Sequence, residues 1–297
     1  MATAKSKKTK ATSKKSSTKP KTTSVAKSVK ETKPEVITTK KGMGKFFARK
    51  FDAKENILTI FKSPKIYGAI LGELLGTMLL AIILLTLGIY QPLYVMFGLI
   101  AITVAVFGLS GANLNPFITV GMLATRRMSA IRGTLYIVAQ VLGAWLGLLL
   151  VSAFAGAAGS QSGVTIPKMA ELADKTFWTV TMIEMVGAAI FAFFFARALT
   201  QKQNVLTFAA VIGCGLLMTI VFAVVVSGYF KLQGNFIFNP AIAIMYQILP
   251  NGGDSFGDII GKVFKALTTY AILPMIGGVV GFYLADLAGF LAGEEQK

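Results

Sequence analysis

The sequence predicts an all-α membrane protein with six transmembrane helices and two re-entrant half-helices, arranged as an inverted 3+1 repeat. First, 54% of the residues are hydrophobic and only 14% are charged, whereas soluble domains average about 45–50% apolar and about 25% charged residues. Second, six apolar stretches are long enough to cross a bilayer. Third, an Asn-Pro dipeptide opens a half-length apolar stretch in each half of the chain. Because three spans per half is an odd number, the second half must be inserted upside down.

The N-terminal region differs in composition from the rest of the chain. Residues 1–65 hold 19 basic and 4 acidic residues, which accounts for most of the net charge of +17. Residues 1–45 carry almost no large apolar side chain, so we expect a disordered, Lys-rich cytoplasmic tail. Contact of this tail with anionic lipid headgroups is one alternative, and nucleic acid binding is another. Residues 46–65 mix charge with Phe and Ile and are expected to form a juxtamembrane surface segment.

A channel domain is predicted over residues 66–292, with repeat one at about 66–155 and repeat two at about 177–292. A membrane crossing needs about 20 apolar residues. The halves also share short motifs: Glu73-Leu-Leu-Gly76 matches Glu184-Met-Val-Gly187, and Gly143 and Gly147 match Gly277 and Gly281. We interpret these glycines as sites of close helix packing. The predicted spans are about 67–89, 92–109, 130–155, 177–199, 205–228 and 265–291.

Each Asn-Pro dipeptide is predicted to start a short helix. Asn is a preferred N-cap, and Pro suits the first helical position because its missing N–H would be unpaired there anyway. A helix of about ten residues after Asn115-Pro116 or Asn239-Pro240 covers about 15 Å, half of the hydrocarbon core. Irregular backbone inside a membrane survives only where it lines water or packs within protein. Segments 110–115 and 229–239 are therefore expected near the midplane, beside an aqueous pathway.

The two half-helices are expected to face one another with their N-termini. Each N-terminus carries roughly +0.5 of an elementary charge, so the space between them disfavours cations. The carboxamides of Asn115 and Asn239 could donate hydrogen bonds to a passing molecule. Carbonyls of residues 111–114 and 235–238 could accept them. This arrangement predicts passage of neutral, hydrogen-bonding solutes.

The composition also argues against enzymatic chemistry. The chain has no His, which removes His metal ligands, a Ser-His-Asp triad and a His-based pH switch. Its single cysteine, Cys214, lies in an apolar stretch and is expected to be a small buried side chain. We therefore expect no enzyme activity, no metal site and no cofactor.

Orientation is predicted from the short loops. The tail, the Arg126–Arg132 loop and the Arg197–Lys202 loop fall on one side of the membrane. Because Lys and Arg are enriched in cytoplasmic loops, both termini are expected to be cytoplasmic in a multi-pass protein of the cell membrane. An outer aromatic belt is then predicted at Tyr90, Tyr94, Trp178 and Tyr229.

These motifs resemble the aquaporin, or major intrinsic protein, family over about residues 66–292. SGANLNPFITV and GNFIFNPA resemble its two Asn-Pro-Ala motifs, here Asn115-Pro116-Phe117 and Asn239-Pro240-Ala241, and GELLGT, IVAQVLGAWLG and IEMVGAA resemble its spans. The resemblance implies a homotetramer with one pore per subunit that conducts water or small neutral solutes, and favours the glycerol-facilitator side. It also implies that Glu73 and Glu184 support the re-entrant loops. Without it, such intramembrane carboxylates would indicate an ion or proton path.

The chain departs from the family pattern at three positions. Asn113 stands in place of a His, Phe117 in place of an Ala that packs between the half-helices, and Ile242 in place of an Arg that forms the outer selectivity constriction. Alignment on the motifs predicts a constriction of Val95, Ser227, Phe236 and Ile242, which is largely apolar and carries no fixed charge. Losing Arg removes up to five donors, so we expect small, neutral, partly apolar solutes to pass.

Two other interpretations stay open at this stage. The same scaffold could form an ion-leaking channel or a specialised solute transporter, which Ile242 would favour. Alternatively, Phe117 or Phe236 could block the pore and leave a closed structural membrane protein.

Overall fold

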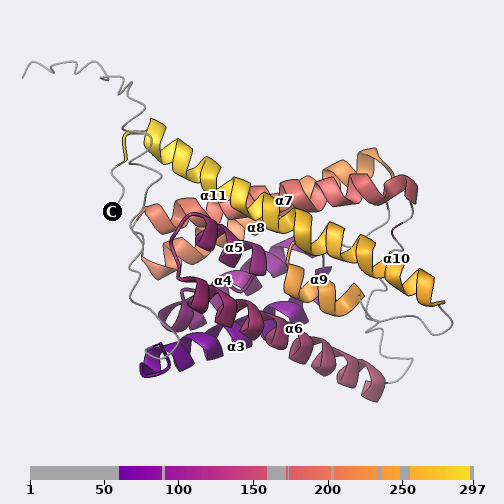
Figure 1. Cartoon of the computed structure of the whole chain (residues 1–297), viewed down its shortest axis with the longest axis horizontal. Coiled ribbons are helices and arrows are strands. Elements are labelled where there is room, and N and C mark those ends of the chain that lie inside the picture. Colours follow the sequence, from indigo (N-terminus) through magenta and orange to yellow (C-terminus); the bar gives the residue numbers. More distant parts are fainter. Residues whose placement is uncertain are drawn as a thin grey trace, which may run out of the picture. The chain divides into compact units, whose positions relative to one another are not determined.

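The computed structural model describes residues 60–88, 91–158, 172, 174–201, 204–232, 236–247 and 255–294. The predicted tail and most of the juxtamembrane segment lie outside this range. Within it, the secondary structure is helical (Figure 1). The helices are α3 (Pro64–Thr86), α4 (Pro92–Ser110), α5 (Pro116–Ala124), α6 (Ala130–Ala158), α7 (Asp174–Thr200), α8 (Val205–Tyr229), α9 (Pro240–Gln247), α10 (Phe256–Leu267) and α11 (Leu273–Leu291), with a π-helical turn, η2 (Thr268–Ile272), between the last two.

The six predicted membrane spans are confirmed, with one change at the last. α3, α4, α6, α7, α8 and the continuous helix Phe256–Leu291 are long and apolar enough to cross a membrane. The last helix begins at Phe256, whereas the sequence pattern placed its start near residue 265. A capping box explains the earlier start: the Ser255 side chain accepts from the Asp258 N–H, and the Asp258 carboxylate accepts from the Ser255 N–H.

Equivalent helices of the two repeats form equivalent pairs. α3 packs along α6, and α7 packs along α11. The predicted role of the glycines in close packing is confirmed. A Cβ at Gly143 would collide with the Leu74 carbonyl, and one at Gly277 with the Met185 carbonyl; at Gly147 it would lie 2.7 Å from the Met78 oxygen. The backbones of each pair can approach this closely only because these positions lack side chains.

The half-helices are exchanged between the repeats. α5 of the first repeat packs on α11 of the second, whereas α9 of the second repeat packs on α6 of the first. At the first contact, a Cβ at Gly278 would lie 2.6 Å from the Phe117 carbonyl oxygen. Each half-helix is therefore held in place by the other repeat.

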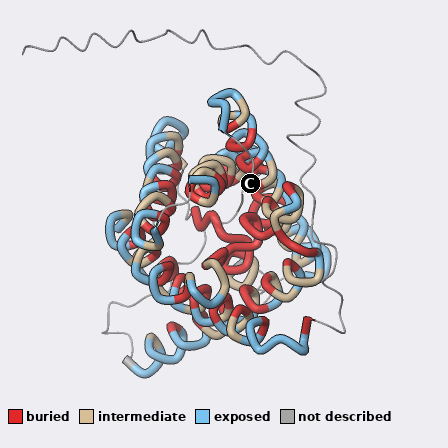
Figure 2. Tube along the Cα trace, turned by 90° about the vertical axis from the view of Figure 1, so that its left-hand side faces the viewer, coloured by how far each residue is buried: buried red, intermediate tan, exposed pale blue. Residues whose placement is uncertain are grey.

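Burial follows this arrangement. Buried residues lie on the inner sides of the long helices and along the irregular segments between them, while exposed residues lie on the outer sides (Figure 2). The expectation that Cys214 is buried was wrong, because its thiol-bearing side chain is exposed. A span that is apolar all round gives no sequence signal for which of its faces points outward.

We expect Gly277→Ala to destabilise the protein, because its new methyl group would meet the Met185 carbonyl. Overpacking of this kind typically costs about 1–3 kcal/mol. Gly108→Ala is a matched control, since Gly108 is also helical but a Cβ there meets nothing within 4 Å. Thermal unfolding in detergent should separate the two variants. Equal melting temperatures would show that the α7–α11 contact tolerates a side chain.

Candidate functional site

Both Asn-Pro dipeptides cap short helices. The Asn115 side-chain oxygen accepts from the Phe117 N–H at 3.1 Å, and that of Asn239 accepts from the Ala241 N–H at 3.1 Å. Pro116 and Pro240 each take the first helical position. α5 has 9 residues and α9 has 8, so at about 1.5 Å per residue each is about 12–14 Å long. Neither could cross a bilayer.

The N-terminal ends of the two half-helices are joined by hydrogen bonds. Asn115 Nδ2 donates to the Phe238 carbonyl at 2.7 Å, and Asn239 Nδ2 donates to the Leu114 carbonyl at 2.8 Å. One N–H of each carboxamide is therefore used within the protein, so at most the second remains for a passing molecule. Likewise, the Leu114 and Phe238 carbonyls, which we expected to be free acceptors, are already engaged. These two reciprocal bonds fix the half-helices head to head.

Backbone strain is concentrated next to these asparagines. Leu114 and Phe238, which directly precede Asn115 and Asn239, have φ values of 55° and 50°, and Ala112 has 55°. Non-glycine residues adopt such left-handed conformations at a cost, and do so mainly where the surrounding structure holds them. In this conformation, the N–H groups of Leu114 and Phe238 each donate to a carboxyl group, and their carbonyls each accept from the Asn of the other loop.

Glu73 holds the first loop through its carboxyl oxygens. They accept from the Asn113 N–H at 2.9 Å and from the Leu114 N–H at 2.7 Å. Gln140 Nε2 donates to the same carboxyl group at 2.7 Å and to Thr119 Oγ1 at 2.9 Å. Asn113 Nδ2 also donates to Thr119, at 3.3 Å. These side chains, all buried, thus connect α3, α6, the loop and α5.

Glu184 holds the second loop with fewer partners. It accepts from the Ile237 N–H at 2.9 Å and from the Phe238 N–H at 3.2 Å. The residues that correspond to Gln140 and Thr119 are Pro274 and Ala243, and neither side chain can donate a hydrogen bond. The second loop is therefore held by its carboxyl group without the additional polar support of the first. Neither Gln140 nor Thr119 was predicted from the sequence to have a role, although a glutamine inside an apolar span was a signal.

The four predicted constriction residues lie in the interior. Val95, Phe236 and Ile242 expose 0%, 2% and 1% of their surface and belong to one apolar cluster with Phe117 and Ala241. The Phe236 ring stacks on Phe238 with 6.2 Å between centroids. Ser227 is nearly buried, and its hydroxyl donates to the Val224 carbonyl of its own helix at 3.0 Å. The three apolar residues therefore have apolar surroundings.

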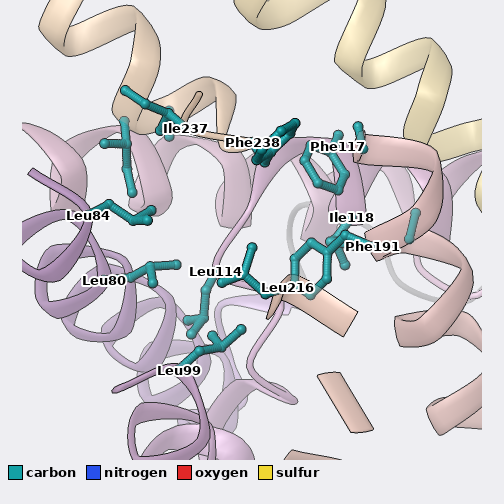
Figure 3. Packing of buried hydrophobic residues seen from close by; sticks show 14 of the residues in the cluster. Leu80, Leu84, Leu99, Leu114, Phe117, Ile118, Phe191, Leu216, Ile237 and Phe238 are labelled. Carbon is teal, nitrogen blue, oxygen red and sulfur yellow. The ribbon is translucent and has the colours of Figure 1, made fainter. Parts of the chain in front are cut away.

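Phe117 contacts two helices of the second repeat, α7 and α11. Its ring meets Phe191 of α7 edge-on, with centroids 5.9 Å apart and planes at 89° (Figure 3). Its backbone and Cβ lie against Gly278 of α11. The glycine at this position allows the backbone of α5 to approach α11 closely.

Charged contacts fix the opposite end of α5. Arg127 forms a bidentate ion pair with Asp286 of α11, at 2.6 and 3.2 Å, and its guanidinium lies 5.3 Å from the Phe282 ring centroid. Nearby, Arg197 donates to Glu294 at 2.6 and 2.8 Å, which lowers the pKa of that exposed carboxyl group below its usual value. Neither pair was predicted, because the partners are far apart in sequence.

The chain is similar to known channel proteins. The family model described as "Major intrinsic protein" matches residues 60–284. The "Glycerol uptake facilitator protein-like 6" of Lactiplantibacillus plantarum is 28% identical over 227 residues, which cover 74% of this chain and 97% of that protein. The "Probable aquaporin PIP2-1" of Oryza sativa subsp. japonica is 35% identical over 97 residues; this match covers 33% of each chain, so it spans only a third of that relative.

Among solved structures, the X-ray structure of the aquaglyceroporin from Plasmodium falciparum resembles this fold with a TM-score of 0.54. It is 18% identical, and the match covers 75% of this chain and 95% of that one. At this identity, the similarity concerns the fold.

Proposed function

Because this chain belongs to the major intrinsic protein family, we propose that it is a passive transmembrane channel for water and small neutral solutes such as glycerol. The observation that carries this proposal is the pair of Asn-capped half-helices bonded head to head. Their N-termini concentrate positive partial charge where they meet, which disfavours cations and leaves neutral molecules unaffected. A transport role of this kind requires no catalytic residue.

Glu73 and Glu184 serve, in this proposal, as loop supports. Their carboxyl oxygens accept from the N–H groups of the strained loops, so they stabilise Leu114 and Phe238 in conformations that would otherwise be unfavourable. An ion or proton path through these carboxyl groups is the weaker interpretation, because their oxygens are engaged in fixed contacts with the loops.

The selectivity constriction is formed by Val95, Ser227, Phe236 and Ile242. Three of these are apolar, and the fourth directs its hydroxyl to its own helix. Such a constriction offers a solute few hydrogen bonds and no fixed charge, so it favours small, partly apolar molecules over ions. Water, which must give up hydrogen bonds to pass, is expected to pass less readily than through a polar constriction.

The cellular arrangement is part of the same proposal. The protein is a homotetramer in the cell membrane, as in the family it resembles. Both termini are cytoplasmic, which the distribution of Lys and Arg among the loops supports. The Lys-rich N-terminal tail then lies beside the cytoplasmic leaflet, where anionic headgroups would attract it by about 1 kcal/mol per nearby basic residue.

A second candidate function is a structural membrane protein with a closed pore. One observation favours it: Val95, Phe236 and Ile242 are almost completely buried, and a pathway open to water would leave some of their surface exposed. Apolar constrictions can exclude water by dewetting. Flux measurements separate the two candidates directly.

The test is stopped-flow light scattering on proteoliposomes challenged with an osmotic gradient, glycerol or urea. We expect glycerol uptake above that of protein-free vesicles. Water flux without any solute flux would contradict the proposed selectivity, and the absence of both would favour the closed protein.

Ile242→Arg should reduce glycerol uptake severalfold, since the longer, charged side chain narrows and polarises the constriction. Ile242→Leu, which keeps the size and apolar character, should retain uptake. If the Arg variant folds stably and its ratio of glycerol to water flux is unchanged, residue 242 does not line the constriction.

A further inference from the structure

The continuous helix Phe256–Leu291 is longer than a membrane crossing requires. Its 36 residues correspond to about 54 Å at about 1.5 Å per residue, against about 30 Å of hydrocarbon and about 40–45 Å for the whole bilayer. The excess lies in α10, which carries Asp258, Lys262 and Lys265 within ten residues. Charged side chains are costly in the hydrocarbon core, so α10 must lie outside it.

α10 nevertheless exposes a stripe of large apolar side chains. Phe256, Ile260 and Phe264 are 79%, 53% and 66% exposed, and their spacing of four residues places them on one side of the helix. Asp258, Lys262 and Lys265 fall on the opposite side by the same periodicity, and Gly261 lies on the flank next to Lys265. Lys265 Nζ donates to the Leu172 carbonyl at 3.2 Å, so the polar side is tied to the chain before α7. Nothing among the described residues covers the apolar stripe.

The π-helical turn η2 keeps this stripe in line with the exposed side of α11. In an α-helix, steps of four residues drift slowly around the axis, and Thr268, four residues after Phe264, is already turned toward the protein. A π-turn takes more residues per turn, so it reduces this drift. Beyond it, Ile272, Ile276 and Val280 are exposed again. After the buried turn, the stripe therefore resumes on the exposed side of α11.

Buried contacts hold η2 in position. Thr269 and Thr181 of α7 share a hydrogen bond at 2.8 Å, and Thr269 and Tyr270 are buried. The rotation between α10 and α11 is therefore set by the fold and does not depend on what surrounds α10. As Figure 1 shows, α10 and α11 run on from one another as one continuous helix.

We propose that the apolar stripe of α10 contacts the outer leaflet of the same bilayer, with the Phe256–Leu291 helix strongly tilted. At a tilt of about 40°, near the upper end of the observed range, about 54 Å of helix spans about 41 Å along the membrane normal, which matches the bilayer with its headgroups. A charged face and an apolar face on one helix are typical of segments that lie in the interfacial region. α10 is then an interfacial anchor that fixes the tilt of α11, against which α5 rests.

Nitroxide scanning of the full chain in liposomes tests this proposal. In a Cys214→Ser background, Ile260→Cys and Phe264→Cys would be spin-labelled alongside Gly261→Cys, a control at almost the same height on the flank next to Lys265. Gly261 accepts a side chain, because a Cβ there meets nothing within 4 Å. We expect the labels at 260 and 264 to collide more with oxygen than with a water-soluble nickel chelate, and the label at 261 to show the reverse.

Two outcomes would overturn the proposal. Equal nickel accessibility at 260 and 261 would place the stripe in water. Protection of 260 and 264 from both reagents, with dipolar broadening between labels, would show that a second copy of the chain covers it. Glycerol uptake measured on the same vesicles reports the proposed channel function separately, so each hypothesis can fail without the other.

Discussion

Replacing Glu73 by alanine is expected to destabilise the protein more than any other single substitution in the loop supports. The change removes the acceptor for Asn113 N–H and Leu114 N–H and one of the two acceptors of Gln140 Nε2, and these donors stay buried. A buried donor left unpaired costs about 1–3 kcal/mol, so the loss is expected to reach several kcal/mol. The first loop also loses the contact that holds Leu114 at positive φ, and solute flux should disappear with it.

Glu184→Ala is the internal control for this prediction. It leaves two N–H groups unpaired, those of Ile237 and Phe238, with no equivalent of Gln140 involved. Glu73→Ala should therefore have the lower melting temperature in detergent and the lower glycerol uptake in vesicles. If Glu184→Ala is equally or more destabilised, the additional polar support of the first loop contributes little.

Much of the fold could be predicted because a bilayer leaves few choices. An apolar stretch of about 20 residues in a membrane must be helical, and an Asn-Pro dipeptide before a half-length stretch restricts where that helix can start. The odd number of spans per half then required the inversion of the second repeat. Even the close contact at Gly277 followed from its match with Gly143.

The details that escaped prediction depend on contacts between distant residues. The cross-bond from Asn115 to the Phe238 carbonyl requires knowing how closely the two helix starts approach, and no periodicity encodes that distance. The Phe117 ring contacts Phe191, which lies far along the chain. The start of α10 was missed because its segment is charged and only weakly apolar, which does not indicate a membrane helix. The capping pair Ser255 and Asp258 nevertheless starts the helix there.

The contributions of Asn115 and Asn239 to stability are expected to be coupled. Asn115→Ala and Asn239→Ala each remove a helix cap, typically worth about 1 kcal/mol, and a cross-loop hydrogen bond, worth about 1 kcal/mol, so each should cost about 2 kcal/mol. The double variant should lose less stability than the two single variants together, because each carboxamide donates a hydrogen bond to the residue that precedes the other Asn. Once one bond is lost, the loops separate and the second bond weakens.

A double-mutant cycle by thermal unfolding measures this coupling, and glycerol uptake and proton leak on the same variants show its consequence. Asn204→Ala, which removes an ordinary cap at an exposed helix start, serves as a comparison, because no cross-loop bond is lost there. Additive losses at 115 and 239 would mean that the two half-helices act independently. The electropositive meeting point would then not depend on their mutual contact, and the head-to-head geometry would lose its role as the basis of ion exclusion.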